Sequence, residues 1–257
     1  MYEALNIAAT GLQNQQRRLD TIANNVANVN SAAYKSARLD FKDALYTAGI
    51  VPASPRTPDG NQQKGHGVMI AGIAKDFSTG IMQATDRSLD IAIEGEGFFE
   101  VGDRNGNTYF TRNGAFDISA EADGRYLVNG EGLYVHDSNG NRISIPYGIE
   151  TISIGTDGTI SFTADEAETT ISLGVYTFRN ITGLMSAGNG TYTESVASGV
   201  KIPANNTVIR QGVLEGSNVN LAEEMTRLIR TQRAFQLASR ALTTADQMEE
   251  IANNMKR

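Results

Sequence analysis

Apolar residues recur every seven positions near both ends of this chain of 257 residues. The first row consists of Leu5, Leu12, Leu19 and Val26, and the second of Leu221, Leu228, Phe235 and Leu242. A seven-residue apolar repeat is typical of a helix that packs along a partner helix. The pattern therefore predicts one helix over about residues 3–30 and a second helix that begins at residue 220.

Both helices carry local signals at their ends. The N-terminal helix is expected to be weak alone, because Gly11 costs about 1 kcal/mol in a helix interior. Asn220 and Glu223 have the spacing of a capping box at the start of the C-terminal helix. Asparagine tolerates the left-handed conformation of a helix cap, and four asparagines crowd the end of the N-terminal helix: Asn24, Asn25, Asn28 and Asn30.

The sequence between the helices changes character twice. Residues 46–67 contain Pro52, Pro55 and Pro58, which block helix and sheet ladder alike and predict an extended loop. Residues 68–213 contain seven Asn-Gly or Asp-Gly dipeptides, which favour tight hairpins, and the runs between them are rich in strand formers. This punctuation predicts a central all-β domain, either a small sandwich or a partly closed barrel.

The predicted fold is therefore of the α+β class. Its terminal helices pair as a coiled-coil-like stalk, and the all-β domain lies between them in the sequence. The expected segments are residues 1–45 (N-terminal helix and docking segment), 46–67 (proline-bearing loop), 68–213 (β domain) and 214–257 (the C-terminal helix, which pairs with the N-terminal one).

Charge and composition exclude several classes of function. The formal net charge is −7, and residues 46–220 alone carry −9, so the acidic middle argues against a nucleic-acid partner. The chain has no cysteine, which excludes disulfide and thiolate chemistry. No secretory leader is visible, and the longest apolar stretch, residues 68–74, is too short to span a bilayer. We therefore expect no membrane insertion.

The candidate catalytic residues are few. His66 and His136 are the only histidines, and neither has the spacing of a metal ligand or of a catalytic triad. Glu94, Glu96 and Glu100 resemble the paired acids of a glycosidase, although a solvated sheet edge is the safer interpretation of the first two, because acids are usually exposed. We expect no catalytic site, no metal site and no cofactor.

The helix rows are the strongest functional signal, and they allow two interpretations. In the simpler one, the helices pair within one molecule. In the other, further apolar and alanine rows extend the pairing to other molecules, since a helix with two apolar faces tends to join a larger array. The residues expected to carry this assembly are Leu5, Leu12, Leu19, Ile22, Val26, Leu221, Met225, Leu228, Phe235 and Leu242.

Three groups of motifs resemble those of the bacterial flagellar rod and hook proteins. They are IANNVANVN at residues 22–30 with Tyr34-Lys35, LDIAIEGEGFF at 89–99 with TRNGAF at 111–116, and SNVNL at 217–221 with QRAFQ at 232–236 and TADQM at 244–248. Ala33 stands where this family usually has glycine. The signature positions are Asn24, Asn25, Asn28, Asn30, Asn218, Asn220, Gln232 and Arg233.

Within this family, the length and the insert at 47–67 are most similar to those of distal rod members, with proximal rod and hook members as alternatives. The resemblance implies a structural protein without catalysis, which polymerises helically through its terminal helices into a torque-transmitting shaft. It implies as partners other copies of the chain, other rod and hook subunits and the flagellar export apparatus. It also implies a periplasm-spanning location, reached without a cleaved signal peptide.

The residues alone also allow a protein of a different functional class. This alternative is a carbohydrate-binding or hydrolytic β domain on a helical stalk, with Glu94, Glu96 and Glu100 as its working acids.

Overall fold

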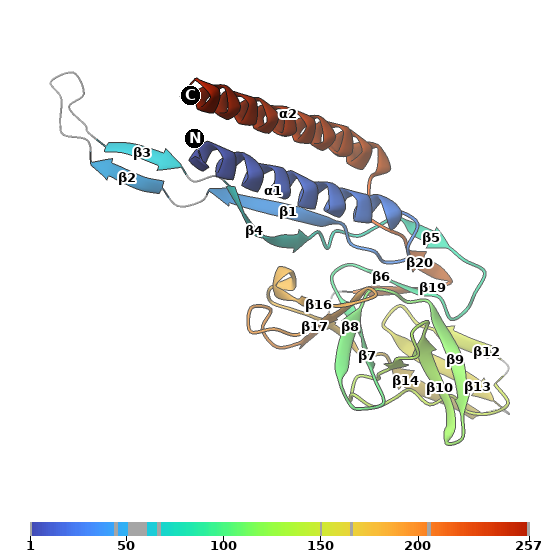
Figure 1. Ribbon diagram of the computed structural model, residues 1–257. Helices are drawn as coiled ribbons and strands as arrows, with labels where there is room; N and C mark the ends of the chain where they lie inside the picture. Colours follow the sequence, from blue (N-terminus) through green and yellow to red (C-terminus); the bar gives the residue numbers. More distant parts are fainter. Residues whose placement is uncertain are drawn as a thin grey trace. The chain divides into compact units, whose positions relative to one another are not determined.

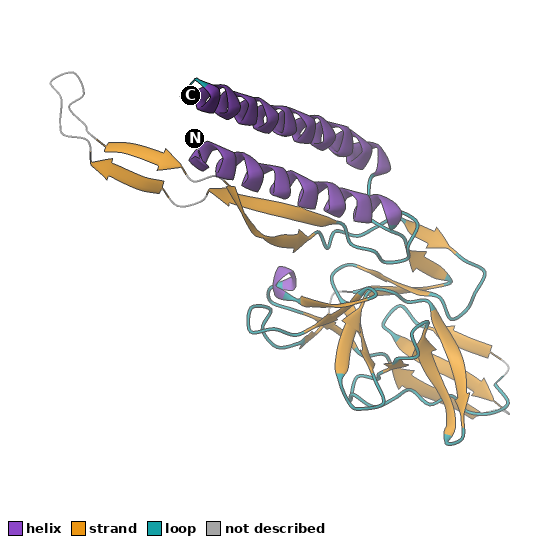
Figure 2. Ribbon diagram, in the orientation of Figure 1, coloured by secondary structure: helices purple, strands orange, loops and turns teal. Residues whose placement is uncertain are grey.

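The computed structural model describes residues 2–43, 46–50, 61–65, 68–149, 151–164, 167–204 and 207–255. These residues divide into two compact units (Figures 1 and 2). Unit 1 comprises the described parts of residues 1–27, 37–75 and 220–257, and unit 2 comprises those of residues 28–36 and 76–219.

Two long helices dominate unit 1. Helices α1 (Tyr2–Ala27) and α2 (Leu221–Asn254) lie side by side and run antiparallel, with the start of α1 and the end of α2 at the same end of the pair (Figure 1). At 1.5 Å per residue, α2 is about 50 Å long. The pairing of the terminal helices is the arrangement that the seven-residue rows predict.

Four strands complete unit 1. Strand β1 (Ala37–Asp43) pairs antiparallel with β4 (Val68–Lys75), and α1 packs on both strands. Strands β2 (Tyr46–Ile50) and β3 (Asn61–Gly65) form a second antiparallel pair within the segment that the sequence predicts to be an extended loop. The three prolines, which cannot donate to a ladder, all lie between these strands and outside the described residues.

Unit 2 is rich in β-structure. Its largest sheet has the order β16-β17-β8-β7-β11-β10-β9, with β15 paired to β7 and β18 paired to β15. These strands are β7 (Phe98–Gly102), β8 (Thr108–Thr111), β9 (Phe116–Glu121), β10 (Gly124–Asn129), β11 (Tyr134–Val135), β15 (Val175–Thr177), β16 (Met185–Gly188), β17 (Thr191–Thr193) and β18 (Ile202–Pro203).

Smaller sheets and one short helix make up the rest of unit 2. Strands β12 (Thr151–Ile154), β13 (Thr159–Ala164) and β14 (Ala167–Ser172) form one sheet, β6 (Ile91–Glu94) pairs with β19 (Val208–Gln211), and β5 (Met82–Ala84) pairs with β20 (Val213–Glu215). The 3₁₀ helix is η1 (Ile181–Gly183). Among the strands that the structure describes, no sheet closes into a barrel.

Strand β7 separates two hydrophobic clusters. Alternate side chains of a strand point to opposite faces, so Phe98 and Phe99 enter different clusters. Phe98 lies among Phe110, Tyr176, Phe178 and Tyr192. The larger cluster on the other side consists of Ile91, Ile93, Phe99, Val101, Phe116, Leu127, Val135, Ile143, Ile145, Ile154, Ile160, Phe162, Leu173 and Ile209.

The left-handed backbone positions differ in part from those that the sequence predicts. Gly106, Gly124, Gly140, Gly158 and Gly190 have positive φ, as their turn dipeptides predict, whereas Gly114 and Gly130 do not. Gly114 instead allows the backbone of Ile91 to approach closely, because a Cβ at residue 114 would lie 1.8 Å from the carbonyl oxygen of Ile91.

The end of the N-terminal helix differs from the prediction as well. None of the asparagines at residues 24, 25, 28 and 30 has positive φ, so the predicted left-handed asparagine cap is wrong. The left-handed residue is Ala33, with φ of 54°. The family's usual glycine would suit this conformation better than alanine, which has a Cβ.

Candidate assembly surface

One face of α2 packs against α1. Leu228, Phe235 and Leu242 of the predicted row are half-buried on this face of α2. On α1, Leu12, Leu19 and Val26 are half-buried and Ile22 is buried, with 5% of its surface exposed. The side chain of Leu5 lies outside the described residues. Most members of the two predicted rows are thus at least half-buried in unit 1, where α1 packs against α2, β1 and β4.

A second row of apolar side chains on α2 is exposed. Leu221, the first member of the predicted seven-residue row, and Met225, which the sequence assigns to assembly, are among these side chains, and each is 44% exposed. The other members are Ile229, Leu237, Met248, Ile251 and Met255, with exposed fractions of 52% to 77%. Isolated exposed apolar residues are normal, but a row along one helix marks an interaction surface.

Asn25 joins three elements of unit 1. Its amide oxygen accepts a hydrogen bond from the backbone N–H of Ala37 (2.9 Å), and its amide nitrogen donates to the carbonyl of Ala37 (2.9 Å). The same nitrogen lies 3.4 Å from the Glu224 carboxylate. Since a side-chain amide carries both a donor and an acceptor, Asn25 pairs with the start of β1 as a neighbouring strand would. It thereby fixes the end of α1 beside β1 and α2.

Asn218 plays a comparable part in unit 2. Its amide oxygen accepts from the backbone N–H of Ser36 (2.8 Å), and its nitrogen donates to the carbonyl of Asp76 (2.8 Å). Its own backbone N–H donates to the carbonyl of Tyr34 (3.3 Å). One side chain therefore holds three segments that are far apart in the sequence.

The other signature residues divide into a cap and a set of surface positions. Asn220 caps α2, because its side-chain oxygen accepts from the backbone N–H groups of Ala222 (3.1 Å) and Glu223 (3.3 Å). The Glu223 carboxylate pairs with Arg227 at 2.5 Å, one turn further along α2. Asn24, Asn30, Gln232 and Arg233 are exposed, and Asn28 is half-buried.

A buried ion-pair cluster in unit 2 escaped the sequence analysis. Lys35 and Glu215 are fully buried side chains whose charged atoms lie 2.6 Å apart, and Arg112 lies 3.4 Å from the other carboxylate oxygen. Burial lowers the pKa of Lys35, and the hydrogen bond and charge of Glu215 oppose that effect. Removing one partner of such a pair leaves a buried charge and costs about 3–5 kcal/mol. The apolar pattern carries no signal for this pairing, because the partners are 180 residues apart.

The three glutamates of the hydrolytic alternative have different surroundings. Glu94 and Glu96 are exposed, and Glu94 forms an ion pair with Arg210 (2.6 Å), in agreement with the interpretation as an exposed edge. Glu100 is buried, with Lys201 2.6 Å and His136 3.2 Å from its carboxylate oxygens. His66 lies outside the described residues.

The described residues offer neither a cluster of metal ligands nor a helix that could span a membrane. They contain no group of three or more His, Cys, Asp or Glu side chains placed to hold a metal ion. None of the helices in the described ranges is long and apolar enough to cross a membrane.

Known protein families match three parts of the chain. Residues 5–35 match the flagella basal body rod protein family, residues 92–162 match the flagellar hook protein FlgE/F/G D1 domain, and residues 210–255 match the flagellar basal body rod FlgEFG protein C-terminal family. The first and last matches contain both predicted helix rows and the residues Asn25, Asn218 and Asn220.

Relatives match over the whole length. The flagellar basal-body rod protein FlgG of Borreliella burgdorferi is 38% identical over 272 aligned positions, with 100% of both chains covered. The chain belongs to the flagellar basal-body rod protein family. FlgG of Bacillus subtilis is 37% identical, and the flagellar hook-basal body complex protein FlhP of the same organism is 32% identical; both alignments cover 100% of each chain. The resemblance read from the sequence motifs is thereby confirmed.

Proposed function

We propose that this chain is a structural subunit of the bacterial flagellar rod, most like its distal part, and not an enzyme. The observation that carries the proposal is the set of apolar side chains that stay exposed along α2 although this helix packs against α1. Burying a Met or Ile side chain contributes about 1.5–3 kcal/mol. Several such residues, buried together against neighbouring copies, would outweigh the entropy of ordering the subunits.

The same reasoning assigns roles to the predicted residues. Leu12, Leu19, Ile22, Val26, Leu228, Phe235 and Leu242 hold the helix pair together, in a coiled-coil-like manner. Leu221 and Met225 join the row that other copies cover. The signature amides at 25 and 218 hold the segments that lead into and out of the helices. The four-segment division at residues 45, 67 and 213 remains a prediction.

The proposal includes a place and a set of partners. The chain would polymerise helically with copies of itself and meet other rod and hook subunits, as part of a shaft that spans the periplasm and carries torque. The flagellar export apparatus would deliver it there. Support comes from the family and from the names of the relatives, which are basal-body rod and hook-basal body proteins.

Two neighbouring residues of α2 provide the test. Ile229 is exposed, whereas Leu228 is half-buried on the seam. Ile229→Asp is expected to keep the helix content of the wild type, measured by circular dichroism at 222 nm, and to lose the growth of particle size with concentration. Leu228→Asp is expected to lose helix content as well, because it places a charge in the seam.

The conservative variant Ile229→Leu is the control and should assemble like the wild type. Sedimentation velocity and electron microscopy over a concentration series provide the readout. Growth of Ile229→Asp particles equal to that of the wild type would contradict the proposal that the exposed row carries assembly.

A further inference from the structure

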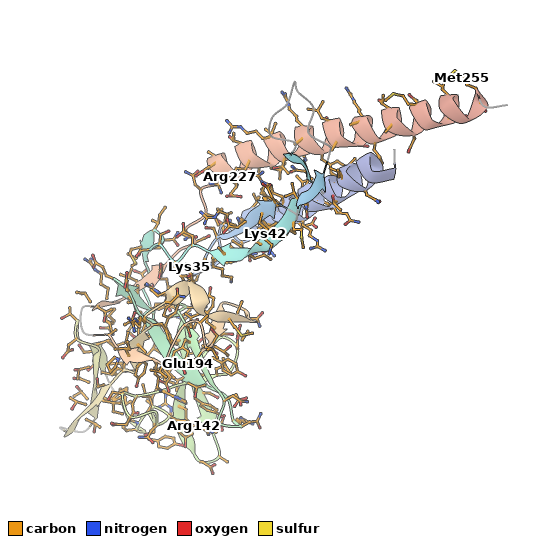
Figure 3. The ribbon with its side chains drawn as sticks, turned by 90° about the vertical axis from the view of Figure 1, so that its left-hand side faces the viewer. Lys35, Lys42, Arg142, Glu194, Arg227 and Met255 are labelled. Atoms are coloured by element: carbon orange, nitrogen blue, oxygen red, sulfur yellow. The ribbon has the colours of Figure 1, made fainter. Side chains whose placement is uncertain are left out.

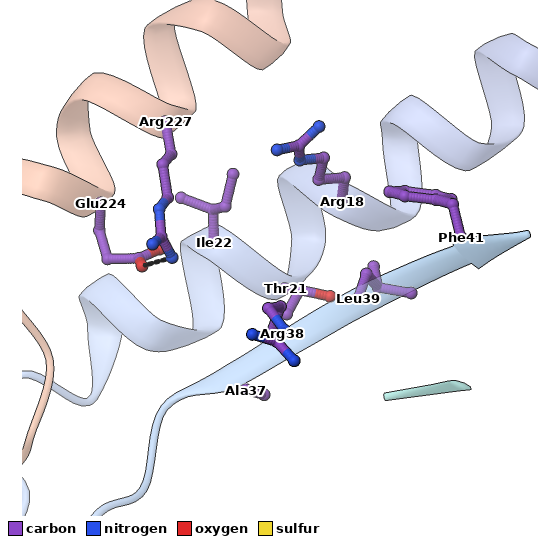
Figure 4. Close-up of a pocket in the computed structure, with 9 residues that line it drawn as sticks. All are labelled: Arg18, Thr21, Ile22, Ala37, Arg38, Leu39, Phe41, Glu224 and Arg227. Carbon is purple, nitrogen blue, oxygen red and sulfur yellow. Dashed lines mark hydrogen bonds and ion pairs between the residues drawn. The ribbon is translucent and has the colours of Figure 1, made fainter. Parts of the chain in front are cut away.

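A groove of about 240 Å³ opens in unit 1 between α1, β1 and the first turns of α2 (Figure 4). Its apolar floor consists of Ile22, Leu39 and Phe41. Three arginines stand at its rim, one from each element: Arg18, Arg38 and Arg227. A groove of this kind suits a segment that combines an apolar side chain with a carboxylate.

The three arginines differ in their partners. Arg227 pairs with Glu223 and Glu224, and Arg38 pairs with Asp40 at 3.0 Å. Arg18 has no carboxylate partner among the described residues, and its guanidinium carbon lies 5.9 Å from the centre of the Phe41 ring. A cation beside an apolar ring is therefore available to an incoming acid.

The opposite end of α2 carries the complementary chemistry. Met248, Ile251 and Met255 are exposed there, by 58%, 57% and 77%. Glu250 is exposed next to Ile251, and within the described part of the chain it has no ion-pair partner. An acid thus borders an exposed apolar row, as Arg18 borders the apolar floor of the groove.

We propose that the groove receives the last turns of α2 from a second copy of the chain, with Glu250 against Arg18 and Ile251 on the floor beside Phe41. This inference rests on the proposed assembly of the chain and names one of its contacts. We choose a second copy as the occupant because Arg18 of the groove and Glu250 near the C-terminal end of α2 (the tail) have complementary charges and belong to the same sequence.

The geometry of α2 supports a contact between copies. Arg227 and Met255 stand near opposite ends of the helix (Figure 3), and at 1.5 Å per residue they are about 40 Å apart. A copy therefore does not fill its own groove with its own straight helix. Because groove and tail are different surfaces, the contact is heterologous, and each copy keeps one free groove or tail for the next. Such contacts produce open filaments unless the rotation closes a ring.

Reversing the two charges tests the contact in the full-length chain. Arg18→Glu and Glu250→Arg are each expected to raise the concentration needed for half-maximal association by about tenfold, since attraction is replaced by repulsion. The double variant is expected to return to within about twofold of the wild type. Arg17→Glu is the matched control, because it makes the same charge change at an exposed position that does not line the groove.

Disulfide trapping gives an independent measurement, because the chain has no cysteine of its own. Phe41→Cys and Ile251→Cys, mixed as separate proteins and oxidised, are expected to form a mixed disulfide dimer, because the proposed contact places these two positions side by side. Dimers of each variant with itself alone would show a symmetrical contact and overturn the proposal.

The outcomes separate this inference from the proposed function. If both charge reversals associate like Arg17→Glu while Ile229→Asp does not associate, the groove contact is wrong and the rod function stands. If the wild type remains monomeric at every concentration, both are wrong. Association of the wild type only with another acidic protein would assign the groove to a different partner and overturn the proposal.

Discussion

Glu100 is a carboxylate whose surroundings reverse the usual effect of burial. Burial alone would raise its pKa, but hydrogen bonds from His136 and Lys201, with the positive charge of Lys201, hold the pKa below its ordinary value. Lys201 also lies 4.5 Å from the centre of the Tyr176 ring. The folded state therefore favours the charged form of Glu100, and folding is coupled to pH through this residue.

The lowered pKa predicts a specific pH dependence. The stabilisation is fully present above the unfolded pKa of about 4.3 and is lost as the pH falls from there through the lower folded pKa. In Glu100→Gln the free energy of unfolding should depend less on pH in this range, since glutamine does not titrate. Urea unfolding at a series of pH values between 3 and 7 measures this pH dependence, with Glu94→Gln, a change at an exposed position, as the control. An unchanged acid slope in Glu100→Gln would count against this account.

At the scale of elements, α2 shows why one helix has two functions. Its apolar residues follow two rows, one covered by α1 and one exposed. The covered row keeps the helix folded, because long helices depend on packing of an apolar face. The exposed side chains are less buried in the single chain, so they contribute less to its stability and remain available for other copies.

The meeting of α1, β1 and α2 at Asn25 leads to a second prediction. Asn25→Asp keeps the acceptor for the Ala37 N–H but loses the donor, so the Ala37 carbonyl lacks that bond and a second carboxylate faces Glu224. We expect a loss of about 1–3 kcal/mol in the free energy of unfolding. Asn30→Asp, at an exposed position near the same helix end, is the control and should change it little. Equal stability of the two variants in urea titrations would refute the role given to Asn25.

At the scale of the molecule, the two units differ in how they are stabilised. In the described part of unit 1, Ile22 is the one buried apolar side chain, whereas unit 2 contains two buried clusters. Hydrophobic burial is the main favourable term in folding, so the helix pair depends more on neighbours than the β-rich unit does.

This difference predicts two steps on heating a dilute sample. Helix signal at 222 nm should fall about 10 °C or more below the near-ultraviolet tyrosine signal, because each kcal/mol shifts the midpoint of a small domain by about 4–8 °C. Tyr134 and Tyr192, buried in unit 2, report on that unit. Raising the protein concentration should move the helix transition upward, since assembly stabilises the helices by mass action. A single transition seen by both signals at every concentration would contradict this prediction.

Features that depend on near neighbours along the chain could be predicted from the sequence. The seven-residue rows gave the two helices, Asn220 gave the cap of α2, and most of the turn dipeptides gave hairpins, since each of these requires only local backbone geometry or periodicity. The family followed from the same motifs. At residues 46–67 the prolines were a poor guide, because all three lie in the sequence between β2 and β3 and leave the residues of these strands free to pair.

Which apolar residues of α2 are covered, and so which are left for assembly, depends on how the folded chain packs in space. The same packing pairs Lys35 with Glu215, Asn25 with Ala37 and Glu224, and Glu100 with Lys201. It also forms the groove beside Arg18 from three separate elements. These contacts join residues that no periodic pattern links, because burial and ion pairing depend on where the chain returns in space rather than on spacing along it.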